Sequence, residues 1–326
     1  MTVTVMITTR DRCADLELTC RRLTELNPPP NEVIIFADGC RDGTSQMVRC
    51  RFPEFRLLKS DSPIGSVYGR DRMLREACGE IVLSLDDDSY PIQNDFIAQL
   101  NQIFANHPEA AVVVFPELRQ GNNYSAADKT SKSRGHYVSA YANCAAAMRR
   151  SFYLQQPGFP KFFQHMYEEP DYALQCYAAG SAVWFEPSIS VRHFESTAHR
   201  ALIRRHHLNA RNELWSVWLR CPWPWLILVS AWRIARQFIY ASTEGIFWGL
   251  REPLWWLAAL RGLAQCWKTR RPVTWRTYWH WLTLARRSIY CDRDLQLKFP
   301  QPTEHPLPLG EGMGDGNLAS TTPKLQ

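Results

Sequence analysis

An α/β fold with a mostly parallel sheet, covered by helices on both faces, is predicted for residues 1–195. Amphipathic helices are predicted beyond them. Three observations support this. Short β-branched runs alternate with helix-like stretches over residues 1–115. These runs are apolar on both faces, which is typical of strands buried between two helix layers. Twelve of the thirteen tryptophans lie between Trp215 and Trp281, so the later part of the chain has a different chemistry.

The predicted elements follow one another at the spacing of βαβ units, which form parallel sheets with right-handed crossovers. Strands are expected at residues 2–8, 32–37, 55–59, 80–85 and 111–115. Helices are expected between them, at residues 12–26, 43–50, 66–77 and 95–106. A further helix is expected to begin near Glu168, with Pro170 in its first turn and Gly180 as its stop.

Polar side chains follow three of the predicted strands: TTRDR at 8–12, ADGCRDGT at 37–44, and the acids Asp86, Asp87 and Asp88. Ligands of such sheets bind beyond the carboxyl ends of the strands, so these groups are expected to meet on one rim. Paired carboxylates suit Mg²⁺ or Mn²⁺ bound together with substrate phosphates. The alternative is an acidic turn in water. Neither a G-x-G-x-x-G nor a P-loop motif is present, which argues against those two nucleotide folds.

Four stretches, in order and at matching spacing, resemble family 2 glycosyltransferases of the GT-A fold. They are VMITTRDR (5–12), VIIFADGCRDGTSQMV (33–48), GSVYGRDRMLREACGEIVLSLDDDS (65–89) and GFPKFFQHMYEEPDYALQCYAAG (158–180), followed by EPSISVRH (186–193). The resemblance covers roughly the first 195 residues. It implies transfer of a sugar, with inversion, from a nucleotide-diphospho-sugar to an acceptor hydroxyl, assisted by Mn²⁺ or Mg²⁺.

The resemblance also implies which residues hold the donor and the metal. Thr8, Thr9 and Arg10 would line the base pocket, Asp38 would accept a hydrogen bond from the nucleoside, and Arg70 and Asp71 would flank the nucleotide. Asp86, Asp87 and Asp88 would lie against the donor, with Asp86 and Asp88 holding ribose and metal and Asp88 the direct metal ligand. His193 would join the metal and the diphosphate. The alternative for His193 is an ordinary hydrogen-bonded histidine.

Glu168 and Glu169 align with the acidic pair of the resembled family. Sugar transfer to an alcohol needs a base for the acceptor proton, and a carboxylate with a raised pKa suits this task. The resemblance gives that role to Glu169, with Glu168 next in line, and makes Asp171 structural. The alternative is that acids near a helix start simply stabilise the helix.

The segment between the donor half and the acidic pair divides into two parts. Residues 118–135 form a polar stretch that is either a mobile lid or plain surface. Residues 136–150 follow, and the resemblance places them near the floor of the site.

The chain changes character at residue 196. Residues 1–195 carry a net charge of −4, whereas residues 196–298 carry +12 and combine Trp and Arg on amphipathic helices. No stretch is long and apolar enough to span a bilayer. Trp and Arg together suit an anionic membrane surface, and a lipid-linked acceptor would explain that location. The alternatives are a soluble helical core and a nucleic-acid surface; no nucleic-acid partner is expected, because a stacking groove would not need the accompanying Leu, Ile and Phe.

These inferences divide the chain into four parts. Residues 1–115 bind the nucleotide-sugar, residues 116–195 bind the acceptor, residues 196–298 contact the membrane, and residues 299–326 form a disordered tail. The ten scattered cysteines and the absence of a secretory signal indicate a protein at the cytoplasmic face of the cell membrane. Two other functions remain open: a nucleotidyltransferase on a similar sheet, and a non-catalytic relative that binds nucleotide or membrane.

Overall fold

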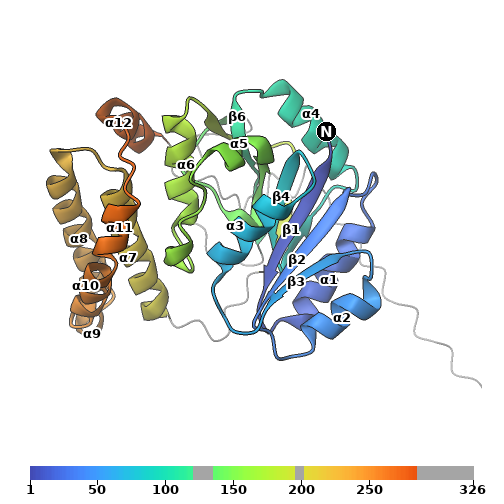
Figure 1. Ribbon diagram of the computed structural model, residues 1–326, viewed down its shortest axis with the longest axis horizontal. Helices are drawn as coiled ribbons and strands as arrows, with labels where there is room; N and C mark the ends of the chain where they lie inside the picture. The colour runs from blue at the N-terminus through green and yellow to red at the C-terminus, as the bar shows by residue number, and fades with distance from the viewer. Residues whose placement is uncertain (120–134, 195–201, 285–326) are drawn as a thin grey trace, which may run out of the picture. The chain divides into compact units, whose positions relative to one another are not determined.

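The computed structural model describes residues 1–119, 135–194 and 202–284 (Figure 1). The predicted lid at 118–135 and the predicted tail at 299–326 lie largely or wholly outside these residues. Met1–Cys291 form one compact unit, so the Trp-rich helices pack together with the α/β part. The four-part division of the chain stays a prediction.

Eight strands of the described chain form the central sheet, in the order β3-β2-β1-β4-β9-β6-β10-β8. Their bounds are β1 Val3–Thr9, β2 Glu32–Asp38, β3 Arg56–Ser60, β4 Ile81–Asp86, β6 Ala110–Val114, β8 His136–Tyr137, β9 Ala146–Arg149 and β10 Ala182–Phe185. β1 pairs in parallel with β2 and β4, as expected of βαβ units. β9 runs antiparallel between β4 and β6, a pairing that the sequence patterns did not predict.

Helices cover both faces of this sheet, which confirms the predicted α/β class (Figure 1). They are α1 Cys13–Thr24, α2 Thr44–Arg51, α3 Ser66–Glu76, α4 Phe96–Asn106, α5 Arg150–Gln155 and α6 Glu168–Ala178. Val5 and Ile7 of β1 pack with α1 and α4, whereas Met6 packs on the opposite face with α3. β1 is buried along its whole length because alternate side chains enter two separate cores.

A second sheet determines where His193 lies. It contains β5 Ser89–Pro91, β11 Val191–His193 and β7 Glu117–Arg119, in the order β5-β11-β7. β11 runs antiparallel to β5, with His193 opposite Ser89, and parallel to β7, with His193 opposite Arg119. The pairing therefore brings His193 next to the residue that follows the three acids.

Six helices follow in the third described segment: α7 Leu202–Arg220, α8 Trp225–Thr243, α9 Ile246–Gly249, α10 Glu252–Arg261, α11 Leu263–Lys268 and α12 Trp275–Thr283. They join the α/β part through a shared core and a buried ion pair. Trp215 and Trp255 belong to the same hydrophobic cluster as Tyr172 of α6. Arg220 Nη2 lies 2.9 Å from Asp171 Oδ2, and both side chains are buried.

The tryptophans of this helical part range from buried to exposed, and Trp218, Trp248, Trp256 and Trp275 are half-buried. Trp215, Trp255 and Trp281 are buried, as the soluble-core alternative requires. Trp223, Trp225, Trp232, Trp267 and Trp279 are exposed, together with many aliphatic side chains of α8–α10. Within the part of the chain that the structure describes, no helix combines the length and the hydropathy needed to cross a membrane.

Candidate active site

The three predicted strand ends do meet on one rim of the central sheet. A cavity of about 650 Å³, here called the donor cavity, lies at the carboxyl ends of β1 and β2. Its lining includes five of the predicted site residues: Thr8, Thr9, Arg10, Asp38 and Asp87. Parallel strands place their carboxyl ends at the same edge, which explains this convergence.

Asp38 shapes the wall of the donor cavity. Its carboxylate accepts hydrogen bonds from the backbone N–H groups of Ile64 and Gly65, at 2.7 and 3.0 Å. Gly65 has a φ of +103°, and a Cβ there would lie 2.4 Å from the carbonyl oxygen of Gln164. Glycine is therefore required for the close approach of these two loops. The approach places Ser66 Oγ 3.0 Å from His165 Nδ1, at the edge of the cavity.

A second cavity of about 480 Å³, here called the reaction cavity, adjoins the first. It is lined by Asp86, Asp88, Glu168, Glu169 and His193, and it shares Arg12, His165 and Arg205 with the donor cavity. Residues 140–144 form another part of its wall, as the resemblance implied for the segment 136–150. The structure thus brings both predicted acidic groups and the predicted histidine to one space.

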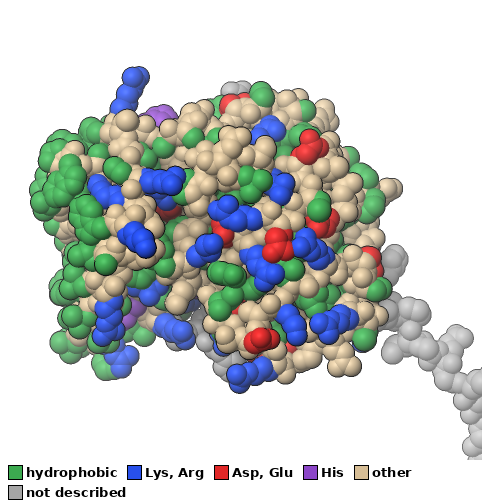
Figure 2. Space-filling model, viewed as in Figure 1, with side chains coloured by type: hydrophobic (Ala, Val, Ile, Leu, Met, Phe, Trp, Pro, Cys, Tyr) green, Lys and Arg blue, Asp and Glu red, His purple; other side chains and the backbone are tan. Residues whose placement is uncertain are grey.

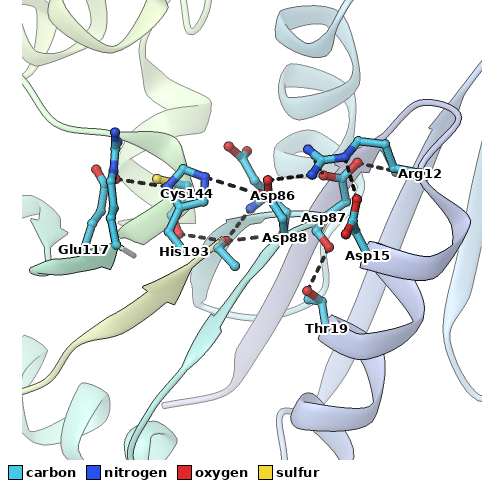
Figure 3. Close-up of polar contacts among 12 residues, drawn as sticks. Arg12, Asp15, Thr19, Asp86, Asp87, Asp88, Glu117, Cys144 and His193 are labelled. Atoms are coloured by element: carbon cyan, nitrogen blue, oxygen red, sulfur yellow. Dashed lines mark hydrogen bonds and ion pairs between the residues drawn. The ribbon is translucent and has the colours of Figure 1, made fainter. Parts of the chain in front are cut away.

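Arg12 neutralises two of the three consecutive acids (Figure 3). Its guanidinium lies 2.9 Å from Asp87 Oδ1 and 2.7 Å from Asp88 Oδ2. Asp87 also accepts a hydrogen bond from the hydroxyl of Thr9, and its backbone carbonyl accepts one from Thr19. Burial, with the charges of its acidic neighbours, raises the pKa of Asp87 to about 7 despite Arg12. The acids do not splay into water, so the exposed-turn alternative is wrong.

His193 lies between two carboxylates (Figure 3). Its Nε2 is 3.2 Å from Asp88 Oδ1, and its Nδ1 is 3.1 Å from Glu117 Oε2. Burial alone would lower the pKa of this imidazole, but the two carboxylates outweigh burial and raise the pKa to about 10. Against the effect of burial, His193 and Arg12 lower the pKa of Asp88. Arg12 and His193 are therefore two internal cations that balance these acids.

Asp86, Cys144 and His193 offer ligand atoms within 4.8 Å of one another, and Asp88 touches His193. Burial raises the pKa of the Cys144 thiol well above its usual value, so this group stays protonated and is a poor ligand for a hard cation. The two carboxylates and the imidazole are a donor set that Mn²⁺ accepts. Binding there would require loss of the proton from His193.

Arg70 links the two acidic groups of the reaction cavity. It is buried, and it donates to Glu168 Oε1 at 2.8 Å and to Asp86 Oδ1 at 2.6 Å. Asn143 Nδ2 donates to the same oxygen of Glu168 at 3.2 Å. Glu168 is thus a buried carboxylate with two partners that hold it in place.

Glu169 has a different environment, although it is the next residue. Its carboxylate accepts a long hydrogen bond, of 3.4 Å, from the backbone N–H of Asn143. Burial and the adjacent charge of Glu168 raise the pKa of Glu169 to about 8, although Arg70 opposes them. A carboxylate with a raised pKa in a cavity is suited to proton transfer.

The family model described as glycosyl transferase family 2 matches residues 4–165. This chain belongs to glycosyl transferase family 2. The match covers the donor-cavity lining except Arg204, Arg205 and Leu208, it includes Asp86–Asp88, and it ends just before the acidic pair at 168–169. The protein is a glycosyltransferase, so the non-enzymatic alternative and the nucleotidyltransferase alternative are set aside. No curated protein matches the chain.

Solved structures with the same fold are glycosyltransferases. A mannosyltransferase from Pyrobaculum calidifontis, in complex with GDP-Man and Mn²⁺, is 17% identical with a TM-score of 0.54, covering 80% of this chain and 86% of its own. TarS from S. aureus, in complex with UDP-GlcNAc, is 17% identical with a TM-score of 0.58, covering 85% and 83%. GalNAc-T7 with UDP, GalNAc and Mn²⁺ is 13% identical with a TM-score of 0.56, covering 75% and 50%. At these identities the likeness shows the GT-A fold.

One predicted donor residue of this glycosyltransferase lies elsewhere. Asp71 is buried, but it accepts a hydrogen bond from Tyr153 at 2.8 Å and pairs with Arg75, and it lines neither cavity. It follows Arg70 in a helix, so its side chain points about 100° away around the helix axis. Asp71 therefore faces neither cavity in this structure, and its expected place beside the nucleotide stays a prediction. Asp171 was expected to be structural. Its carboxylate accepts hydrogen bonds from Ser216 and Arg220 of α7, which agrees with that role.

Sequence reasoning missed several residues of the site. Arg12 was within a quoted motif but received no role, although its position three residues after the end of β1 was a usable signal. Glu117 and Asn143 come from segments with no quoted motif, whereas His165 lies within GFPKFFQHMYEEPDYALQCYAAG (158–180) but received no role. They reach the site through pairing of β7 with β11, and through the turns that precede β9 and α6. Only the tertiary structure could reveal them.

Proposed function

We propose that this glycosyltransferase transfers a sugar from a nucleotide-diphospho-sugar to an acceptor hydroxyl, with inversion at the anomeric carbon. The observation that carries the proposal is Glu169, a carboxyl group of raised pKa in a cavity that also contains Asp86 and Asp88. The adjoining donor cavity is large enough for a small molecule, since such sites run to ~300–1,000 Å³.

In the proposed reaction, the acceptor oxygen forms a bond to the anomeric carbon as the bond from that carbon to the phosphate oxygen breaks. Glu169 takes the acceptor proton on its carboxylate, and the nucleoside diphosphate leaves. Glu168 does not take this role because Arg70 and Asn143 hold its Oε1 and its Oε2 is buried away from the cavity surface. Arg70 instead fixes Glu168 against Asp86, which keeps the acceptor side and the donor side at a constant separation.

The donor is proposed to lie across the rim, with its nucleoside against Thr8, Thr9, Arg10 and Asp38 and its phosphates toward the three acids. The complexes of relatives with GDP-Man and UDP-GlcNAc support a nucleotide-sugar of this kind. Asp86, Asp88 and His193 would hold Mn²⁺ or Mg²⁺, which would neutralise charge on the leaving diphosphate. Arg12 is placed to contact the same phosphates, because it lines both cavities.

The acceptor is proposed to be a lipid-linked or cell-surface glycan precursor, met at the inner face of an anionic membrane. Figure 2 shows hydrophobic side chains gathered over α8–α10. Ile246 and Leu250 are 83% and 73% exposed there. A contiguous exposed apolar surface marks an interaction site, and arginines beside it, such as Arg251 and Arg261, suit anionic headgroups.

The decisive experiment combines binding and turnover. UDP and GDP are each tested for thermal stabilisation of the full chain, with and without Mn²⁺, and nucleotide-sugars are then screened for hydrolysis. Stabilisation that requires Mn²⁺, with release of nucleoside diphosphate from one donor, supports the proposal. Absence of any response to either nucleotide refutes it. Flotation with anionic liposomes at low salt tests the membrane part separately, and protein that stays at the bottom of the gradient contradicts that part.

A further inference from the structure

A third cavity, of about 720 Å³, lies among the helices that follow the family-matched region. It is bounded by α7, α8 and α9, and we refer to it as the helical cavity. It shares Met166, Tyr167, Arg205 and Asn209 with the reaction cavity, so the two spaces have a common wall. A molecule reacting beside Glu169 could therefore extend into it.

One side of the helical cavity is aromatic. Tyr240 and Trp248 have ring centroids 6.5 Å apart at an interplanar angle of 81°. The buried ring of His206 lies 5.4 Å from Tyr240 and 5.6 Å from Trp248. Glu252 accepts from His206 at 2.7 Å, which fixes this ring as a support for the other two. The cluster offers flat apolar surface with polar edges, a combination that suits amphipathic ligands.

The remaining lining is polar, and it is held rigidly. Buried Glu213 accepts hydrogen bonds from Arg233, Arg236 and Gln237, each at 2.5 Å, which fixes Arg236 and Gln237 at the wall. Asn209 and Glu244 add further polar groups to the lining. The wall thus contains both hydrogen-bond donors and acceptors.

This combination discriminates between ligand classes. The lining contains two arginines, Arg205 and Arg236, and two glutamates, Glu213 and Glu244, so their formal charges cancel and the cavity offers no excess positive charge to a phosphate. A sugar ring has apolar C–H faces, and its hydroxyl groups both donate and accept. An aromatic surface beside mixed donors and acceptors therefore favours a sugar over an anion.

We propose that the helical cavity binds a non-reacting sugar ring of the glycosyl acceptor, with Trp248 and Tyr240 against its face. The inference rests on the proposed function and deepens it, because it makes the acceptor a saccharide of at least two rings or a glycosylated molecule. It also assigns acceptor selection to helices outside the family-matched residues.

The test uses saturation-transfer difference NMR on the full chain. The probes are methyl glycosides of glucose, galactose, mannose and N-acetylglucosamine, each measured with and without saturating UDP or GDP. We expect at least one glycoside to give a signal that survives the nucleotide and that falls about ten-fold in Trp248→Ala. Trp279→Ala is the matched control, because Trp279 is 57% exposed on α12 and lines none of the three cavities; its signal should not change.

Tyr240→Ala serves as a second variant, and circular dichroism melting confirms that each variant folds. The inference is overturned if no glycoside binds, if Trp248→Ala and Trp279→Ala bind equally, or if UDP or GDP displaces the glycoside. Vesicle binding that Trp248→Ala abolishes, without any glycoside signal, also overturns it and assigns the cavity to lipid. Failure of the proposed function is recognised by a different measurement. In that case neither UDP nor GDP stabilises the protein against heat, whether or not a glycoside gives an NMR signal.

Discussion

Two adjacent glutamates of this glycosyltransferase have different chemistry because their partners differ. Glu168 is buried and bound by Arg70 and Asn143, whereas Glu169 has one long hydrogen bond from a backbone N–H. The pKa of Glu169 is raised to about 8 by burial and by the charge next to it. From the sequence, either glutamate could be the base, with Glu169 preferred. The hydrogen-bond partners and the burial of the two carboxylates also favour Glu169.

Glu169→Gln should retain the shape of the site and lose the base. We expect unchanged stabilisation by UDP or GDP with Mn²⁺, and a transfer rate lower by ~10²–10⁴-fold. Steady-state transfer assays with the active donor measure this. Glu168→Gln is the comparison, and a normal rate in Glu169→Gln would move the base to Glu168.

The raised pKa of Glu169 also predicts a pH dependence. The base must be ionised to accept a proton, so kcat/KM should rise with pH through about 8 and level off above it. Measurement of kcat/KM from about pH 6 to about pH 9.5 tests this dependence. A profile in Glu169→Gln that keeps the same rise would assign the titration to another group.

Asp88→Asn should remove one carboxylate from the metal set while leaving the neighbouring Arg12 and His193 in place. We expect the Mn²⁺-dependent part of nucleotide stabilisation to disappear, because an amide is a weaker ligand than a carboxylate. Differential scanning fluorimetry with GDP or UDP and a Mn²⁺ titration measures it. Asp15→Asn is a control, since Asp15 also contacts Arg12 but lies outside both cavities. Equal Mn²⁺ dependence in both variants would contradict the assignment.

At the scale of elements, α6 connects the chemistry to the helical part of the chain. Its first turn contains Glu168 and Glu169, and its Asp171 binds Arg220 of α7 in the interior. The position of the base therefore depends on how α7 packs. Breaking this contact is expected to affect stability before it affects binding of the donor.

Asp171→Asn leaves the guanidinium of Arg220 buried without its ionic partner. Removing one partner of a buried pair costs ~3–5 kcal/mol, so we expect a loss of that order in the free energy of unfolding. Urea denaturation measures it. The double variant Asp171→Asn/Arg220→Gln should lose less than the sum of the two single variants, because neither charge is left alone. Strict additivity would show that the pair does not act as a unit.

At the scale of the whole molecule, the exposed apolar side chains of α8–α10 set the helical part apart from the α/β part. Scattered exposed apolar residues need no explanation, but a contiguous set does. Three of its tryptophans are buried in shared cores, so the same region supplies both a packed interior and an apolar exterior.

Ile246→Ser/Leu250→Ser should weaken binding to anionic liposomes by ~10²-fold or more, since each of the two side chains loses ~1.5–3 kcal/mol of burial in the membrane. Liposome flotation measures the binding. The matched control is Leu18→Ser/Leu154→Ser, which changes two side chains exposed by 42% and 40% on α1 and α5. Donor hydrolysis should be normal in both. Equal loss of flotation in the two double variants would refute the assignment of this surface.

The sequence by itself determined the α/β class, the order of the strands along the chain, and the polar strand ends at 8–12, 37–44 and 86–88. Periodicity and strand-end chemistry are local properties, so they can be read from neighbouring residues. The same holds for the start of α6 at Glu168, where acids and a proline mark a helix N-terminus.

Only the tertiary structure decided which of these groups share a space and in which state of charge. The antiparallel insertion of β9, the contact of His193 with Glu117, and the turning of Asp71 toward Tyr153 all depend on pairings between distant segments. The pKa of Glu169 depends on burial and on Arg70, and that of His193 on burial and on carboxylates far away in the sequence. Such interactions fall off with distance in space and not with separation along the chain, so no local pattern contains them.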